Sequence, residues 1–206
     1  MDPSDTSKSV RAFVAVAIPQ RLIEALNEVQ DQLRPKVRAE LIRWTKPDQL
    51  HLTLKFLGNV PGNRLEELKA ALNRACEGQQ PFQIALEHLG CFPTARNPRV
   101  IWVGIGGERE TLPRLQRSID EATRGFGDHS EPRAFQPHLT IGRVKAEPRR
   151  AMEVGAAVEQ TPLGRLGEWK VGEVELMQSQ LLPEGARYSK LAALALPSSV
   201  PRTAAA

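Results

Sequence analysis

Two short stretches of the chain alternate between polar and apolar side chains in the same order. Residues 51–54 read His-Leu-Thr-Leu, and residues 138–141, which begin 87 positions later, read His-Leu-Thr-Ile. Because successive side chains of a strand point to opposite faces, each stretch predicts a strand with one apolar face and one face that carries an imidazole and a hydroxyl. Repetition at a little under half the chain length predicts two similar lobes, each contributing one strand to a shared cleft.

The hydrophobic pattern of the remaining chain predicts further strands and helices around these two. Adjacent pairs of strands break a simple strand–helix alternation, so the expected class is α+β, with largely antiparallel sheets and helices over their outer faces. We expect a single bilobal domain at 10–197, a disordered leader at 1–9 and a disordered tail at 198–206. The predicted strands span 11–18, 51–58, 82–86, 99–105, 138–143, 170–180 and 188–196; the predicted helices span 19–34, 65–76, 112–122 and 149–158; loops or turns are predicted at 90–98, 125–137 and 183–185.

The first predicted strand carries a candidate substrate contact, Phe13. Ala12, Val14, Val16 and Ile18 share one face of this strand, which is expected to be core, whereas Phe13 lies among small alanines on the opposite, cleft face. An aromatic side chain there could stack on a nucleobase. The alternative interpretation is that Phe13 packs beneath a loop.

Composition and charge narrow the class of protein. With 41% hydrophobic residues in 206, the chain can bury a sizeable core, and its formal net charge of +4 suits a phosphate-bearing partner without demonstrating one. Cys76 and Cys91 have no zinc-site spacing and are expected to be reduced thiols. The N-terminal residues lack the pattern of a signal peptide, and no apolar run approaches membrane-spanning length, so a cytoplasmic protein is expected.

Both His-x-Thr motifs are intact, and the residues around them carry a resemblance to a known family. The supporting positions are Arg-Ala-Phe-Val-Ala at 11–15, Trp44, Pro47, Phe-Leu-Gly at 56–58, Phe-Gln-Pro at 135–137, Ser179 and Tyr188. Over residues 10–197 the sequence resembles the 2H phosphoesterases. More narrowly, it resembles the bacterial and archaeal RNA 2′,3′-cyclic phosphodiesterases, also called 2′-5′ RNA ligases. The resemblance implies two pseudo-symmetric lobes around a central cleft.

Two histidines and two threonines suit the chemistry that this resemblance implies. Opening a ribose 2′,3′-cyclic phosphate with water requires a base for the water, an acid for the departing oxygen and hydrogen-bond donors for the phosphoryl oxygens. Histidine, with an ordinary pKa near 6.5, can take either proton role, and the hydroxyls of Thr53 and Thr140 can donate to the phosphate. The resemblance implies that His51 is the proton donor and His138 the acceptor, which gives a 2′-phosphomonoester. The residues alone leave the mirror arrangement open, which would give the 3′ product.

Two cationic side chains are further candidates for the same site. The resemblance points to Arg143 as a phosphate contact, although strict alternation would place it on the apolar face of its strand; Gly142 could allow a bulge that re-aims it. Lys55 has the appropriate parity in the first motif and is a candidate substrate contact, with Phe56 at the position equivalent to Arg143. No metal and no cofactor are expected.

The expected function is metal-independent hydrolysis of RNA 2′,3′-cyclic phosphate ends, with 2′-5′ RNA ligase activity in the reverse direction. The expected partner is an RNA or nucleotide with such an end, with no membrane or protein partner, and the protein is expected to be a monomer. One alternative is a phosphodiesterase for another small cyclic nucleotide phosphate or for 2′-5′ oligonucleotides. Another is a non-catalytic RNA-binding module, which two imidazoles argue against because binding alone needs cations and stacking surfaces.

Overall fold

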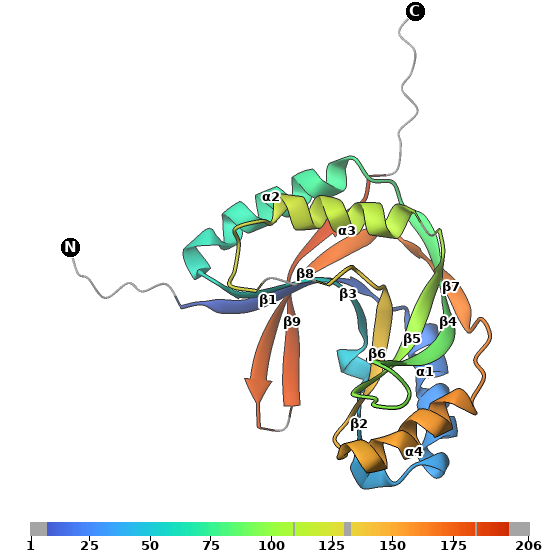
Figure 1. Cartoon of the computed structure of the whole chain (residues 1–206). Helices are drawn as coiled ribbons and strands as arrows, with labels where there is room; N and C mark the ends of the chain where they lie inside the picture. Colours follow the sequence, from blue (N-terminus) through green and yellow to red (C-terminus); the bar gives the residue numbers. More distant parts are fainter. Residues whose placement is uncertain (1–7, 109, 130–132, 184, 198–206) are drawn as a thin grey trace, which may run out of the picture.

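The computed structural model of the chain describes residues 8–108, 110–129, 133–183 and 185–197 (Figure 1). The predicted disordered leader and tail lie almost entirely outside the described residues, and so does part of the turn expected at 183–185.

Two antiparallel sheets form the framework, as the alternation of the sequence predicts. The first sheet has the strand order β3-β1-β8-β9 and the second has the order β2-β6-β5-β4-β7. Helices α2 and α3 pack together over the first sheet, and α1 and α4 cover the second (Figure 1). The strands are β1 Val10–Ala17, β2 Ile42–Trp44, β3 His51–Val60, β4 Phe82–Phe92, β5 Val100–Gly107, β6 His138–Val144, β7 Gly167–Val171, β8 Glu173–Leu182 and β9 Gly185–Ala195; the helices are α1 Gln20–Leu33, α2 Leu65–Glu77, α3 Thr111–Ala122 and α4 Pro148–Glu159. The predicted α+β class is confirmed.

The two lobes are not the two halves of the chain, because each lobe takes elements from both. Helix α1 follows a strand of the first sheet but packs on the second, where the side chain of Gln30 bonds to the carbonyl oxygen of Ile141 in β6. Helix α3 follows a strand of the second sheet but packs on β3 of the first, where Asp120 pairs with Lys55. Strand β8, which belongs to the second half of the chain, likewise pairs with β1 of the first half.

One predicted strand proves to be two strands in different sheets. The apolar pattern predicts a single strand at 170–180, but the chain turns at Gly172, so that β7 pairs with β4 and β8 pairs with β1. The alternation changes phase at this point, because Trp169 and Val171 are buried before it, whereas Glu173 is exposed and Val174 is buried after it. The prediction was wrong because it joined apolar positions on both sides of this phase change into one strand.

Strand β4 also differs from its prediction. It continues to Phe92, over residues predicted to be a loop, and it contains a bulge at His88, where φ is +63°. The extra residue interrupts the period of two on which the strand prediction rests. The short strand β2 was not predicted, because three residues carry no usable period.

A bulge at the same place interrupts both motif strands. In β3, the partners in β1 pass from Thr53 to Lys55 and skip Leu54, and in β6 the partners in β5 pass from Thr140 to Gly142 and skip Ile141. In each strand the residue after the threonine is therefore the extra one. The bulge sets the orientation of the side chains that come directly after it.

Candidate active site

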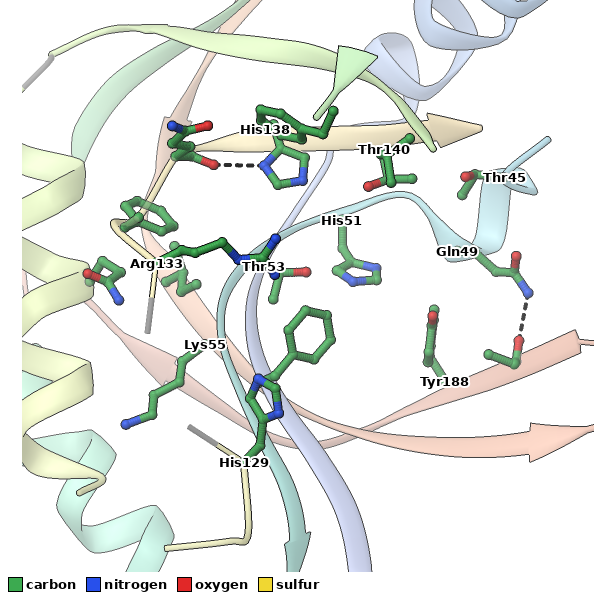
Figure 2. Close-up of a pocket in the computed structure, with 18 of the residues that line it drawn as sticks. Thr45, Gln49, His51, Thr53, Lys55, His129, Arg133, His138, Thr140 and Tyr188 are labelled. Carbon is green, nitrogen blue, oxygen red and sulfur yellow. Dashed lines mark hydrogen bonds between the residues drawn. The ribbon is translucent and has the colours of Figure 1, made fainter. Parts of the chain in front are cut away.

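The two motif strands line one cleft between the sheets. Strands β3 and β6 pack against each other, and His51, Thr53, His138 and Thr140 all face a cavity of about 1570 Å³ (Figure 2). The prediction that the motif strands face one another is therefore confirmed. Small-molecule pockets usually measure about 300 to 1,000 Å³, so the cleft has room for more than one nucleotide.

Each histidine ring is held by the carbonyl group two residues before it. Nδ1 of His138 lies 2.7 Å from the carbonyl oxygen of Gln136 (Figure 2), and a hydrogen bond to the backbone of Gln49 acts to raise the pKa of His51. A carbonyl oxygen only accepts hydrogen bonds, so Nδ1 of His138 carries the proton. Nε2 is thereby the nitrogen that accepts or donates a proton during a reaction.

Aromatic side chains pack against both histidine rings. The ring centroid of Phe13 lies 4.8 Å from that of His51, and Tyr188 meets His51 edge-on at 5.1 Å. Phe92 meets His138 edge-on at 4.9 Å. Phe13 is on the cleft side of β1, as predicted, but only 2% of it is exposed. Its predicted role as a stacking surface for a base is therefore wrong, and the alternative of packing applies: it supports His51.

Burial and a neighbouring cation lower the pKa of both histidines. Burial lowers the pKa of His51 to about 4, with Arg143 adding to the effect and the Gln49 carbonyl opposing it. The same causes, with Gln136 in place of Gln49, lower the pKa of His138. Arg143 lines the same cavity as both rings and contributes to the lowered pKa of each. At neutral pH and without a substrate both rings are neutral.

The bulge in β6 places Arg143 in the cleft. Ile141 and Gly142 are both buried, and Arg143, which follows them, is exposed and lines the cavity. A buried side chain from the other half of the chain holds this bulge: Gln30, which is 3% exposed, donates from Nε2 to the carbonyl oxygens of Ile141 and Thr45, at 2.9 Å each. The bulge that Gly142 led us to expect is confirmed.

The matching bulge in β3 brings Phe56 into the cleft beside Lys55. Phe56 lines the cavity with 48% of its surface exposed and meets the ring of His129 edge-on. Lys55 points away from His51 toward α3, where its Nζ lies 2.7 Å from Oδ1 of Asp120 (Figure 2). Lys55 lines the cleft, as its parity predicts, but its Nζ is paired with Asp120, and Phe56 is the exposed aromatic that the sequence interpretation missed.

Positive side chains predominate along the cleft. Its lining contains eight cationic side chains and two carboxylates, a larger excess than the +4 of the whole chain. Such a surface attracts a polyanion. The cations are Arg43, Lys46, Lys55, Arg99, Arg117, Arg124, Arg133 and Arg143, and the carboxylates are Asp120 and Asp128. Across the described residues no cluster of three or more histidine, cysteine or acidic side chains is placed to hold a metal ion, and no described helix is long and apolar enough to cross a membrane.

Two neutral imidazoles on facing strands, two hydroxyls and one arginine beside both rings define an acid–base centre for phosphate-ester chemistry. A family model described as LigT-like phosphoesterase matches the chain twice, at residues 16–102 and 103–188. The two matches begin 87 positions apart, which is also the separation of His51 and His138. The chain belongs to the LigT-like phosphoesterase family, which confirms the resemblance found in the sequence.

Named relatives and solved structures agree with this membership. An RNA 2′,3′-cyclic phosphodiesterase of Methanothermobacter thermautotrophicus is 35% identical over 88% of this chain and 96% of its own length. A solved structure from Thermus thermophilus has a TM-score of 0.74 and 30% identity, covering 92% of this chain and all of its own. E. coli LigT complexed with 3′-AMP has a TM-score of 0.71 and 26% identity, covering 92% of this chain and 99% of its own.

Proposed function

We propose that this chain hydrolyses RNA 2′,3′-cyclic phosphate ends to 2′-phosphomonoesters by two-histidine acid–base catalysis. The observation that carries the proposal is the pair of histidine rings on β3 and β6 that line one cleft together with Arg143. The relatives named RNA 2′,3′-cyclic phosphodiesterase support the substrate class.

The proposed reaction is an in-line displacement at phosphorus. His138 takes a proton from water as the water oxygen attacks, the bond from phosphorus to O3′ breaks, and His51 gives its proton to O3′. The hydroxyls of Thr53 and Thr140 and the guanidinium of Arg143 stabilise the charge on the non-bridging oxygens. Each turnover transfers one proton to His138 and one from His51, so the rings exchange roles in the reverse reaction. With a 5′-hydroxyl in place of water as the nucleophile, the same displacement joins O5′ to phosphorus, releases O3′ and leaves a 2′-5′ phosphodiester, which is the ligase activity.

The lowered pKa of His51 determines when the acid acquires its proton. With a pKa of about 4 in the free protein, His51 is neutral at pH 7 and cannot serve as an acid. An anionic phosphodiester placed between the rings favours the charged imidazolium and raises its pKa. The negative charge of the bound substrate therefore allows His51 to take up the proton that it later donates.

The cytoplasm is the proposed location. Cys76 and Cys91 are both free thiols, and burial raises the pKa of each to about 11, so neither is primed for redox chemistry. Unpaired cysteines are usual in a reducing compartment.

The test is product analysis by phosphorus NMR after incubation with a nucleoside 2′,3′-cyclic phosphate in EDTA. A 2′-phosphate is expected, and a 3′-phosphate would retain the reaction but reverse the roles of the two histidines. His51→Ala and His138→Ala should abolish turnover, whereas His88→Ala should not, because its side chain is 75% exposed outside the cleft. Absence of turnover with mononucleoside and oligonucleotide substrates alike would overturn the proposal, and loss of activity on chelation would overturn its metal independence.

A further inference from the structure

Helix α3 presents a polar stripe to the cleft on the side away from Tyr188. Its apolar residues Leu112, Leu115 and Ile119 are buried against the first sheet. On the other side of the helix and just beyond its end, Gln116, Arg117, Asp120 and Arg124 line the cavity. A helix with one apolar face normally turns its polar face to bulk water. Here part of that face borders the active-site cleft.

The charge of this stripe is positive, because its single carboxylate is already paired. Asp120 accepts from Nζ of Lys55 at 2.7 Å, and the same Nζ lies 3.1 Å from its carbonyl oxygen. Within the part of the chain that the structure describes, the guanidinium groups of Arg117 and Arg124 make no hydrogen bond, ion pair or ring contact, and both residues are exposed. Two guanidinium groups that face a cleft without a protein partner suit phosphate oxygens.

The fifth residue after the histidine differs between the two motifs, and this difference determines on which side of the histidines the nucleoside of the substrate lies. The residue five positions after the histidine is Arg143 in the second motif and Phe56 in the first. Arg143 acts on both histidines, whereas the exposed ring of Phe56 lies beside Lys55, whose side chain reaches α3. A phosphate at Arg143 and a base on Phe56 place the terminal nucleoside on the α3 side of the histidines. The rest of the RNA then leaves the site along α3.

We propose that Arg117 on the cleft face of α3 and Arg124 just beyond the end of this helix bind backbone phosphates of the single-stranded RNA that precedes the cyclic phosphate end. This inference rests on the proposed function. Arg117 lies roughly 7.5 Å along the helix from its last residue, Ala122, and Arg124 lies beyond that end, so the two side chains contact different phosphates of an extended strand. The enzyme therefore favours oligoribonucleotides over mononucleotides that carry the same reactive group.

The test compares a mononucleoside 2′,3′-cyclic phosphate with an oligoribonucleotide that ends in the same nucleoside. The kcat/KM for the oligoribonucleotide, divided by the kcat/KM for the mononucleoside, should fall about tenfold or more in the double variant Arg117→Gln, Arg124→Gln. The salt dependence of oligonucleotide affinity should also weaken, its logarithmic slope decreasing by about 0.7 for each phosphate of the single strand that the variant no longer binds. Arg114→Gln is the matched control, because Arg114 is exposed on the same helix but does not line the cleft.

An unchanged kcat/KM ratio and an unchanged salt slope in the double variant would overturn the inference. If the wild-type protein turned over neither substrate, the proposed function would be refuted. RNA binding by Arg117 and Arg124 would then be tested separately, by an affinity measurement. Fluorescence anisotropy with a 3′-phosphorylated oligoribonucleotide measures affinity without turnover. Weaker binding by the double variant than by Arg114→Gln supports the surface, and equal binding refutes it.

Discussion

Binding of the product should raise the pKa of His51 by several units. The anionic phosphate adds negative charge next to a ring whose charged form is disfavoured in the free protein. In the free protein, burial is the largest cause of the lowered pKa of about 4, and Arg143 adds to it. A nucleoside 2′-monophosphate in the cleft brings negative charge next to both the imidazole and the guanidinium. Both effects favour the imidazolium.

The size of the effect follows from Coulomb's law. Two unit charges 4 Å apart interact by about 4 kcal/mol at an effective dielectric constant of about 20. One pKa unit corresponds to about 1.4 kcal/mol, so a phosphate anion at that distance raises the pKa by about 3 units. His51 should therefore titrate near pH 7 with the product bound, against about 4 without it.

The measurement is an NMR titration of the histidine ring protons with and without saturating product. Spectra of His51→Gln and His138→Gln assign the two active-site rings. The pKa of His138, which burial also lowers in the free protein, should rise as well. The signals of His88, which is outside the cleft, should not respond to the product and so provide the internal control.

The reasoning would be refuted by a His51 midpoint that moved by less than one unit at saturating product. That result would mean that the phosphate binds elsewhere in the cleft, or that His51 does not receive its proton from a substrate-bound state. A rise confined to His138 would instead favour the mirror arrangement, in which His138 is the acid.

Three further predictions test the site and its support. His138→Ala should lower kcat by about 10²–10⁴ and remove one limb of the bell-shaped pH–rate profile, because it removes one of two proton-transfer groups; a retained bell shape would contradict its role. Gln30→Leu should lower both kcat and the free energy of unfolding, the latter by about 1–3 kcal/mol, because it removes the donor to the part-buried carbonyl of Thr45 and one of two donors to the buried carbonyl of Ile141; Gln32→Leu, at an exposed site on the same helix, should change neither. The unfolded chain binds a proton at His51 near pH 6.5 and the folded chain only near 4, so stability should be constant above pH 6.5 and fall by about 3 kcal/mol as the pH drops toward 4. Urea denaturation at several pH values measures this fall, and His51→Gln should remove most of it.

The faces of the motif strands could be predicted from the sequence because a strand has a fixed period of two. Leu52 and Leu139 are both fully buried, as that period requires, while the histidine and threonine of each motif line the cleft. The period fails one residue later. A bulge adds a residue without leaving a distinctive pattern of its own, and so the presence of Phe56 in the cleft beside Lys55 was missed.

The assignment of elements to lobes could not be predicted from the pattern. The amphipathic pattern of a helix such as α1 predicts that one of its faces is buried, but any apolar sheet could cover that face. Only the tertiary structure shows that Gln30 of α1 meets Ile141 of β6, from the other half of the chain. The single buried polar residue in an otherwise apolar helix stripe was the one available signal, and its partner could not be read from spacing.

The interleaving of the lobes has a consequence for how the cleft can move. The chain passes between the sheets at β1–α1, at β2–β3, at α2–β4, on either side of α3 and at β7–β8. Two bodies joined by so many covalent crossings cannot swing open about a single hinge, as the jaws of a two-domain kinase do. The spacing between His51 and His138 is therefore set when the protein folds. No part of the substrate's binding free energy has to go into bringing the acid and the base together.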